Sequence, residues 1–86
     1  MLNFYEVGGV LVRRWVPMQR RMAMEAWHGD GWAPYSDTDQ VFRYGQLLTE
    51  ARALALLHEI RGRVATLAPL SEEDARSALG DRRRRA

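Results

Sequence analysis

The sequence contains no cysteine and no lysine, and asparagine and isoleucine occur once each, as Asn3 and Ile60. Without cysteine, disulfides and thiolate chemistry are excluded. All 13 basic residues are arginine. We attribute this to a GC-rich genome in preference to a functional need for guanidinium groups. No apolar run approaches the roughly 18 residues of a membrane span. The first residues, MLNFYEV, include an acid and no basic residue, so we expect no signal peptide and a cytoplasmic location.

The 86 residues are 47% apolar and carry a net charge of +2. A chain of this size buries roughly 64% of its unfolded surface, which allows one modest core and little room for an enclosed active site. We predict a single domain over residues 1–80. The remaining segment, 81–86, reads DRRRRA and is predicted to be a disordered, arginine-rich tail.

A β-hairpin is predicted at the start of the chain. Residues 2–16, LNFYEVGGVLVRRWV, hold β-branched and aromatic runs on both sides of Gly8-Gly9. Two glycines suit a two-residue turn, because both turn positions take a positive φ. The register that follows pairs Val7 with Val10, Tyr5 with Val12, Glu6 with Leu11, and Phe4 with Arg13. We take the side with Val7 and Val10 as the core side.

Residues 18–27 fit two structures. Every residue in MQRRMAMEA favours a helix, yet the apolar positions form no stripe on a helical wheel. As a strand, this segment would run into an HGDG loop that places Trp27 opposite Trp32 and Met24 opposite Tyr35. Such cross-strand aromatic pairs stabilise antiparallel ribbons. We therefore favour the strand, with a helix as the alternative.

Helices are predicted for the rest of the chain. A short one covers 37–44, DTDQVFRY, with Val41, Phe42 and Tyr44 as its apolar side. The longest covers 49–68, capped by Thr49, and is ended by Pro69 unless Gly62 kinks or ends it earlier. Its apolar stripe is Ala53, Leu57, Ile60, Val64 and Leu67. A last helix follows the cap at Ser71 and stops at Gly80.

These elements predict a small α+β domain. An N-terminal antiparallel β-meander of three or four strands is followed by two or three α-helices packed on one face. The fold class follows from the order of the elements, strands first and helices second.

The HGDG stretch is the main candidate for chemistry. His28 and Asp30, with Asp37 and Asp39, could form a metal or acid–base cluster. Structural and catalytic metal sites need three or four ligands at suitable spacing, whereas Gly and Asp are also what a tight turn requires. We therefore predict a turn and no metal site. No phosphate-binding loop, GxSxG or HExxH motif is present, so we expect neither an enzyme nor a cofactor.

Clustered arginines suggest nucleic-acid binding as an alternative function, because guanidinium groups bind phosphates. The candidate residues are Arg13, Arg14, Arg20, Arg21, Arg82, Arg83, Arg84 and Arg85. Neighbouring arginines on a strand point to opposite faces, however. Residues 28–50 also carry four acids and one arginine, so the net charge of this segment is negative, which does not favour phosphate binding.

A protein interface is the preferred function. Three tryptophans, three tyrosines and four methionines are residue types enriched at interface centres. Helices on one side of the sheet would leave the other apolar face open, and such faces mark interaction surfaces. The residues expected there are Leu2, Phe4, Leu11 and Trp15. We predict a small non-enzymatic protein-binding or regulatory accessory module, of the kind phages encode, whose partner is another protein or a second copy in a homodimer. No small-molecule substrate is implied.

Overall fold

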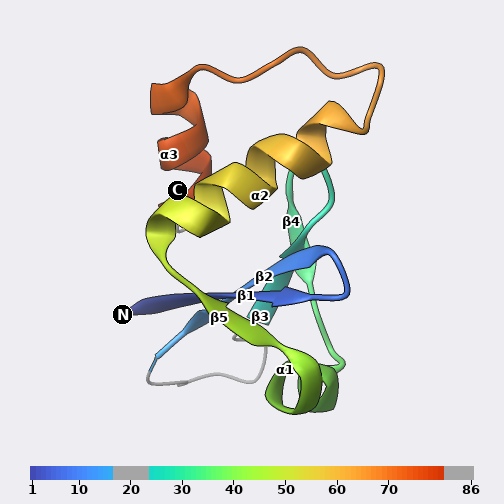
Figure 1. Ribbon diagram of the computed structural model, residues 1–86, viewed down its shortest axis with the longest axis vertical. Helices are drawn as coiled ribbons and strands as arrows, with labels where there is room; N and C mark the ends of the chain where they lie inside the picture. Colours follow the sequence, from blue (N-terminus) through green and yellow to red (C-terminus); the bar gives the residue numbers. More distant parts are fainter. Residues whose placement is uncertain (17–23, 81–86) are drawn as a thin grey trace.

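The computed structural model describes residues 1–16 and 24–80 (Figure 1). Its strands are β1 (Leu2–Val7), β2 (Val10–Trp15), β3 (Met24–Trp27), β4 (Trp32–Pro34) and β5 (Gln46–Leu48). They form one antiparallel sheet in the order β4-β3-β2-β1-β5. The predicted meander thus supplies four strands, and β5 adds a fifth at the far edge of β1.

The β1–β2 hairpin has the predicted register. Val7 lies opposite Val10 and Phe4 opposite Arg13. Gly8 and Gly9 have φ angles of 58° and 85°, a region that is strained for residues with a Cβ. The turn is therefore set by the two glycines, and the turn fixes which side chains share a face.

The second hairpin confirms the strand prediction for Met24–Trp27. Trp27 lies opposite Trp32, and their rings meet edge to face with centroids 5.2 Å apart. The Tyr35 amide donates to the Met24 carbonyl at 3.0 Å, as the predicted pairing requires. The earlier part of the ambiguous segment, residues 17–23, lies outside the described residues.

Three helices follow these four strands: α1 (Thr38–Tyr44), α2 (Glu50–Gly62) and α3 (Glu72–Gly80). The predicted caps of α2 and α3 are confirmed. The Thr49 hydroxyl accepts from the Arg52 amide at 3.2 Å, and the Ser71 hydroxyl accepts from the Asp74 amide at 3.1 Å. Each cap satisfies a backbone donor that has no partner within its helix.

The second helix is shorter than its apolar stripe predicted. It ends at Gly62, so Val64 and Leu67 lie in the loop that leads to α3. This loop packs over the HGDG turn, where a Cβ on Gly29 would come within 3.0 Å of the Val64 side chain. The spacing of Val64 and Leu67 therefore reflects contacts of a loop and not a continued helix.

The helices cover both faces of the sheet unequally. On one face, α2 and α3 pack against Phe4, Leu11 and Trp27. On the opposite face, α1 contributes Val41 to a smaller cluster with Val12. Figure 1 shows α2 and α3 together on one side of the strands and α1 on the other. The predicted α+β class, with a strand meander followed by helices, is confirmed, but the helices do not all pack on one face as predicted, because Val41 of α1 packs on the opposite face.

Among the helices of the described part of the chain, none combines the length and apolar character needed to cross a membrane. The single domain over 1–80 stays a prediction. The predicted tail at 81–86 lies outside the described residues.

The close packing at Gly29 predicts opposite effects for two glycine substitutions. Gly29 has a φ of 99° and a tight contact, so Gly29→Ala should lower the free energy of unfolding by about 1–2 kcal/mol. Gly62 has nothing within 4 Å of an added Cβ, and Gly62→Ala should raise it by up to about 1 kcal/mol. Urea denaturation monitored by tryptophan fluorescence measures both. Equal effects of the two variants would contradict the packing described for this loop.

Candidate functional site

The apolar residues predicted to form an open face lie beneath the helices. Leu11 is fully buried, Phe4 is 7% exposed, and both pack against the core residues of α2 and α3. Leu2 and Trp15 share this face and are half-buried. The prediction that these four residues form an uncovered face is therefore wrong. Both faces of the hairpin carry apolar side chains, and the α2 residues Leu54 and Leu57 cover the side that sequence reasoning left open.

One edge of this covered face remains accessible. A cavity of about 340 Å³ lies between the start of β1, β5 and the end of α3, with Leu2, Phe4, Leu48 and Leu79 among its lining residues. Asn3 and Glu50 also line it. The walls are mainly apolar, and the described lining residues do not pair a base with a nucleophile.

Arg13 is the most unusual residue of the core. Its side chain is 1% exposed, although arginine is almost never fully buried unless it is paired. The guanidinium Nη2 and Nε donate to Glu25 Oε1 on β3 at 2.8 and 3.0 Å. Nη1 donates to the carbonyl oxygens of Leu79 at 2.9 Å and Ala78 at 3.3 Å. Arg13 therefore links the sheet to the last turn of α3.

Two tryptophans complete the surroundings of Arg13. Its Cζ atom lies 4.0 Å from the ring centre of Trp32 and 4.8 Å from that of Trp15, distances typical of cation–π contacts. Trp32 Nε1 also donates to the Ala78 carbonyl at 2.9 Å. The last carbonyl groups of a helix have no partner within it, and positive charge is favourable there. Arg13 and Trp32, which both belong to the sheet, thus supply hydrogen-bond donors to the C-terminal carbonyl groups of α3.

This placement changes the nucleic-acid hypothesis. Arg13 is buried, so it is not available to contact a phosphate, and its assignment to a basic binding ribbon is wrong. Arg14 lies on the opposite face, as strand geometry requires. The other proposed residues, Arg20, Arg21 and Arg82 to Arg85, lie outside the described residues, and their role stays a prediction.

Arg14 lies on the face that carries α1. Its Nη1 donates a long hydrogen bond, 3.4 Å, to the Tyr5 hydroxyl. Its Cζ atom lies 5.5 Å from the ring centre of Phe42 on α1. Its Nε atom is buried and has no hydrogen-bond partner among the described residues. No carboxylate of the described residues forms an ion pair with Arg14.

Two exposed apolar side chains lie on the same face as Arg14. Phe42 is 60% exposed, and Leu47 on β5 is 63% exposed. Leu47 lies opposite Tyr5 in the sheet, so it is on the same face as Tyr5 and Arg14. We call Tyr5, Arg14, Phe42 and Leu47 the α1–β5 surface. It combines a cation that pairs with no acid of residues 1–16 and 24–80, two aromatic rings and an aliphatic side chain.

The sequence did not reveal this surface, because all three apolar residues of α1 were expected to point inward. Val41 is buried beside Tyr35, but Phe42 and Tyr44 are exposed. Successive helical positions differ by about 100°, so a seven-residue helix lying on a sheet cannot bury all three. Partial burial and, secondly, the Asp37 carboxylate raise the pKa of the Tyr35 phenol.

The HGDG turn adopts the predicted hairpin geometry. The His28 amide donates to the Gly31 carbonyl at 2.9 Å, and both His28 and Asp30 are exposed. Within residues 1–16 and 24–80, no group of three or more potential metal-ligating side chains gathers. The backbone of the turn has a structural role, because the Gly29 carbonyl accepts from Arg61 Nη1 at 2.8 Å.

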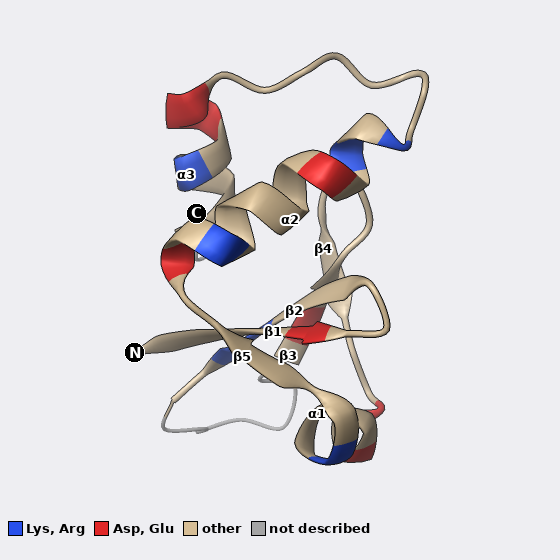
Figure 2. Ribbon diagram, in the orientation of Figure 1, with Lys and Arg blue, Asp and Glu red and all other residues tan. Residues whose placement is uncertain are grey.

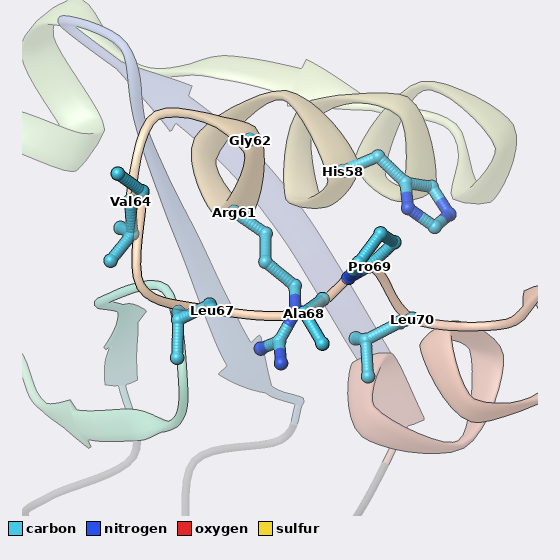
Figure 3. Close-up of a pocket in the computed structure, with 9 residues that line it drawn as sticks. His58, Arg61, Gly62, Val64, Leu67, Ala68, Pro69 and Leu70 are labelled. Carbon is cyan, nitrogen blue, oxygen red and sulfur yellow. Dashed lines mark hydrogen bonds between the residues drawn. The ribbon is translucent and has the colours of Figure 1, made fainter.

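A second cavity, of about 270 Å³, lies between the end of α2 and the loop that follows it. Figure 3 shows Arg61 reaching from α2 to the loop that runs through Ala68. Arg61 Nε donates to the Ala68 carbonyl at 2.7 Å, so this guanidinium ties the loop to α2 and to Gly29. His58 is the other titratable group among the described lining residues. A single imidazole beside a structural arginine does not make an acid–base pair.

Both α2 and α3 carry acidic as well as basic residues, as Figure 2 shows. Two exposed ion pairs, Glu59 with Arg63 and Glu72 with Arg76, lie four residues apart in these helices. Binding of a nucleic-acid backbone is favoured by a continuous stripe of positive charge, and neither helix carries such a stripe.

The burial of Arg13 predicts a large difference between two arginine substitutions. Arg13→Ala leaves Glu25 and two helix-end carbonyls without their donors, so the free energy of unfolding should fall by about 3–5 kcal/mol. Arg76→Ala removes an exposed pair and should change it by less than about 1 kcal/mol. Urea denaturation measures both variants.

A double variant separates the ion pair from the packing around it. Arg13→Met with Glu25→Leu removes both charges together, so it should be less destabilised than Arg13→Ala. Similar stabilities of Arg13→Ala and Arg76→Ala would contradict the role assigned to the buried pair.

Comparison of the chain with protein-family models, with curated proteins and with solved structures finds no significant match. No relative therefore supplies a fold or a function by similarity. What the chain binds has to be inferred from its own surface and contacts.

Proposed function

We propose that the chain is a small non-enzymatic protein-binding module that acts through the α1–β5 surface. The observation that carries this proposal is Arg14, a half-buried arginine with no carboxylate partner among the described residues, which contacts the exposed Phe42 and shares its sheet face with the exposed Leu47. Arginine and aromatic residues are enriched at interface centres and among the residues that dominate binding energy.

The environment of Arg14 favours a protein partner. A partner carboxylate placed against the accessible part of the guanidinium would form a charge-assisted hydrogen bond. Phe42 and Leu47 would lose exposed apolar area in the same contact. The binding of a protein would thus satisfy the polar and the apolar parts of this surface together.

Nucleic-acid binding is less well supported at this surface. Phosphate recognition uses several cations, and the described residues around Phe42 offer Arg14 and Arg43 against the acids Asp37 and Asp39. The alternative now depends on Arg20, Arg21 and the arginines at 82–85, outside the described residues.

Site-specific photo-crosslinking tests the proposed function in the cells that make the protein. A benzophenone amino acid in place of the exposed Phe42 should give a covalent adduct with a protein. The same group in place of Ala51, which is exposed on α2, is the matched control and should give none. Because Leu47 is 63% exposed, Leu47→Asp should keep the fold and lower the adduct yield about fivefold or more.

Mass spectrometry of the adduct identifies what binds. A protein adduct that depends on Leu47 supports the proposal. Equal adducts from positions 42 and 51, or none from 42, would contradict it. An adduct removed by nuclease treatment would assign the surface to nucleic acid instead.

A further inference from the structure

Asp39 lies on the same surface as Arg14 and Phe42. Asp39 is exposed in the first turn of α1, three residues before Phe42. Helical residues three apart are neighbours on one face, with about 5–6 Å between their Cβ atoms. The Arg14 guanidinium lies 5.5 Å from the Phe42 ring. Phe42 is therefore a neighbour of one positive and one negative group.

The two charges do not pair with each other or with the rest of the described chain. Ion pairs in the described residues join Arg13 to Glu25, Arg63 to Glu59 and Arg76 to Glu72. Arg43 follows Asp39 by four residues, a spacing that allows an ion pair, yet no such pair forms in this part of the chain. Arg14 and Asp39 each lack an oppositely charged partner there, and both are neighbours of the exposed Phe42 ring.

A surface of this kind is complementary to itself. In a two-fold symmetric dimer the same patch meets its own copy, so residue i contacts residue j and residue j contacts residue i. A rotation axis beside Phe42 would bring the two rings together at the centre. It would also bring the Arg14 of each copy toward the Asp39 of the other. Both charges would then be paired by one contact.

We propose that two copies of this chain associate through the α1–β5 surface, with Phe42 at the two-fold axis and two reciprocal Arg14–Asp39 ion pairs. The dimer rests on the proposed function, because it names a second copy as the protein that this surface binds. Leu47 and Tyr5 extend the apolar contact outward from Arg14. The chain supplies both members of each ion pair, and this charge complementarity is what points to a second copy.

Charge exchange tests the dimer directly by sedimentation equilibrium. Arg14→Glu and Asp39→Arg each place like charges together, so each should raise the dimer dissociation constant about tenfold or more. The double variant restores opposite charges with their positions exchanged, and should bring the constant back to within roughly threefold of the original. Arg76→Glu, on α3 and away from the surface, is the control and should leave it unchanged.

Two further variants keep the test decisive if a charge-reversal variant fails to fold. Asp39→Asn is a milder change at an exposed position and should weaken the dimer without reversing a charge. Phe42→Asp removes the ring at the axis and should abolish association in the measured range. Circular dichroism of every variant should match the original protein.

The outcomes separate this inference from the proposed function. A chain that stays monomeric at about 1 mM, or a dimer that survives all of these variants, overturns the Arg14–Asp39 dimer. If the chain is monomeric but position 42 still crosslinks to a different protein, the surface binds a partner and the second copy is wrong. If position 42 crosslinks to nothing and the chain is monomeric, both proposals fail. A double variant that dissociates further than either single variant also overturns the reciprocal pairing.

Discussion

The fold depends on one buried cation. Arg13 projects from the centre of β2 and is held by Glu25, by the last carbonyl groups of α3 and by two tryptophan rings. A buried charge is tolerated only where it is paired and hydrogen-bonded. That requirement fixes the relative positions of β2, β3, β4 and α3, since each supplies a group that the guanidinium contacts. In a chain of this size the apolar core is modest, so a polar network of this kind has a large share in specifying the arrangement.

Because α2 and α3 both pack on the Arg13 face, the opposite face of the sheet is thinly covered. Among the described helices, the seven-residue α1 alone packs there, and it buries Val41. Arg14, the next residue along β2, points to this thinly covered side and meets Tyr5 and Phe42 instead of a carboxylate. Of two adjacent arginines in the same strand, one is thus buried and the other is partly exposed, because successive side chains of a strand point to opposite faces. One holds the core together, and the other adjoins the exposed α1–β5 surface on which the proposed function depends.

Local patterns predicted the hairpins well and the interface poorly. Gly8-Gly9 and the two tryptophans around HGDG specify turns and registers through contacts between near neighbours in sequence. By contrast, β5 is three residues long, too short for an alternating pattern to stand out. The face that carries the expected binding residues Leu2, Phe4, Leu11 and Trp15 was predicted to be open, and the wrong face was chosen because both faces of the hairpin are apolar. The open side could have been suspected from α1, in which Val41, Phe42 and Tyr44 cannot all point inward.

The sequence by itself determined the α+β class, the pairing of the first four strands and the caps of α2 and α3, since these follow from glycine conformations, side-chain periodicity and single hydrogen bonds within a few residues. Only the tertiary structure decided which sheet face the long helices cover and which of two neighbouring arginines is buried. The physical reason is that these choices depend on partners far apart in the chain. Arg13 bonds with residues 65 and 66 positions away, and no local pattern carries that information.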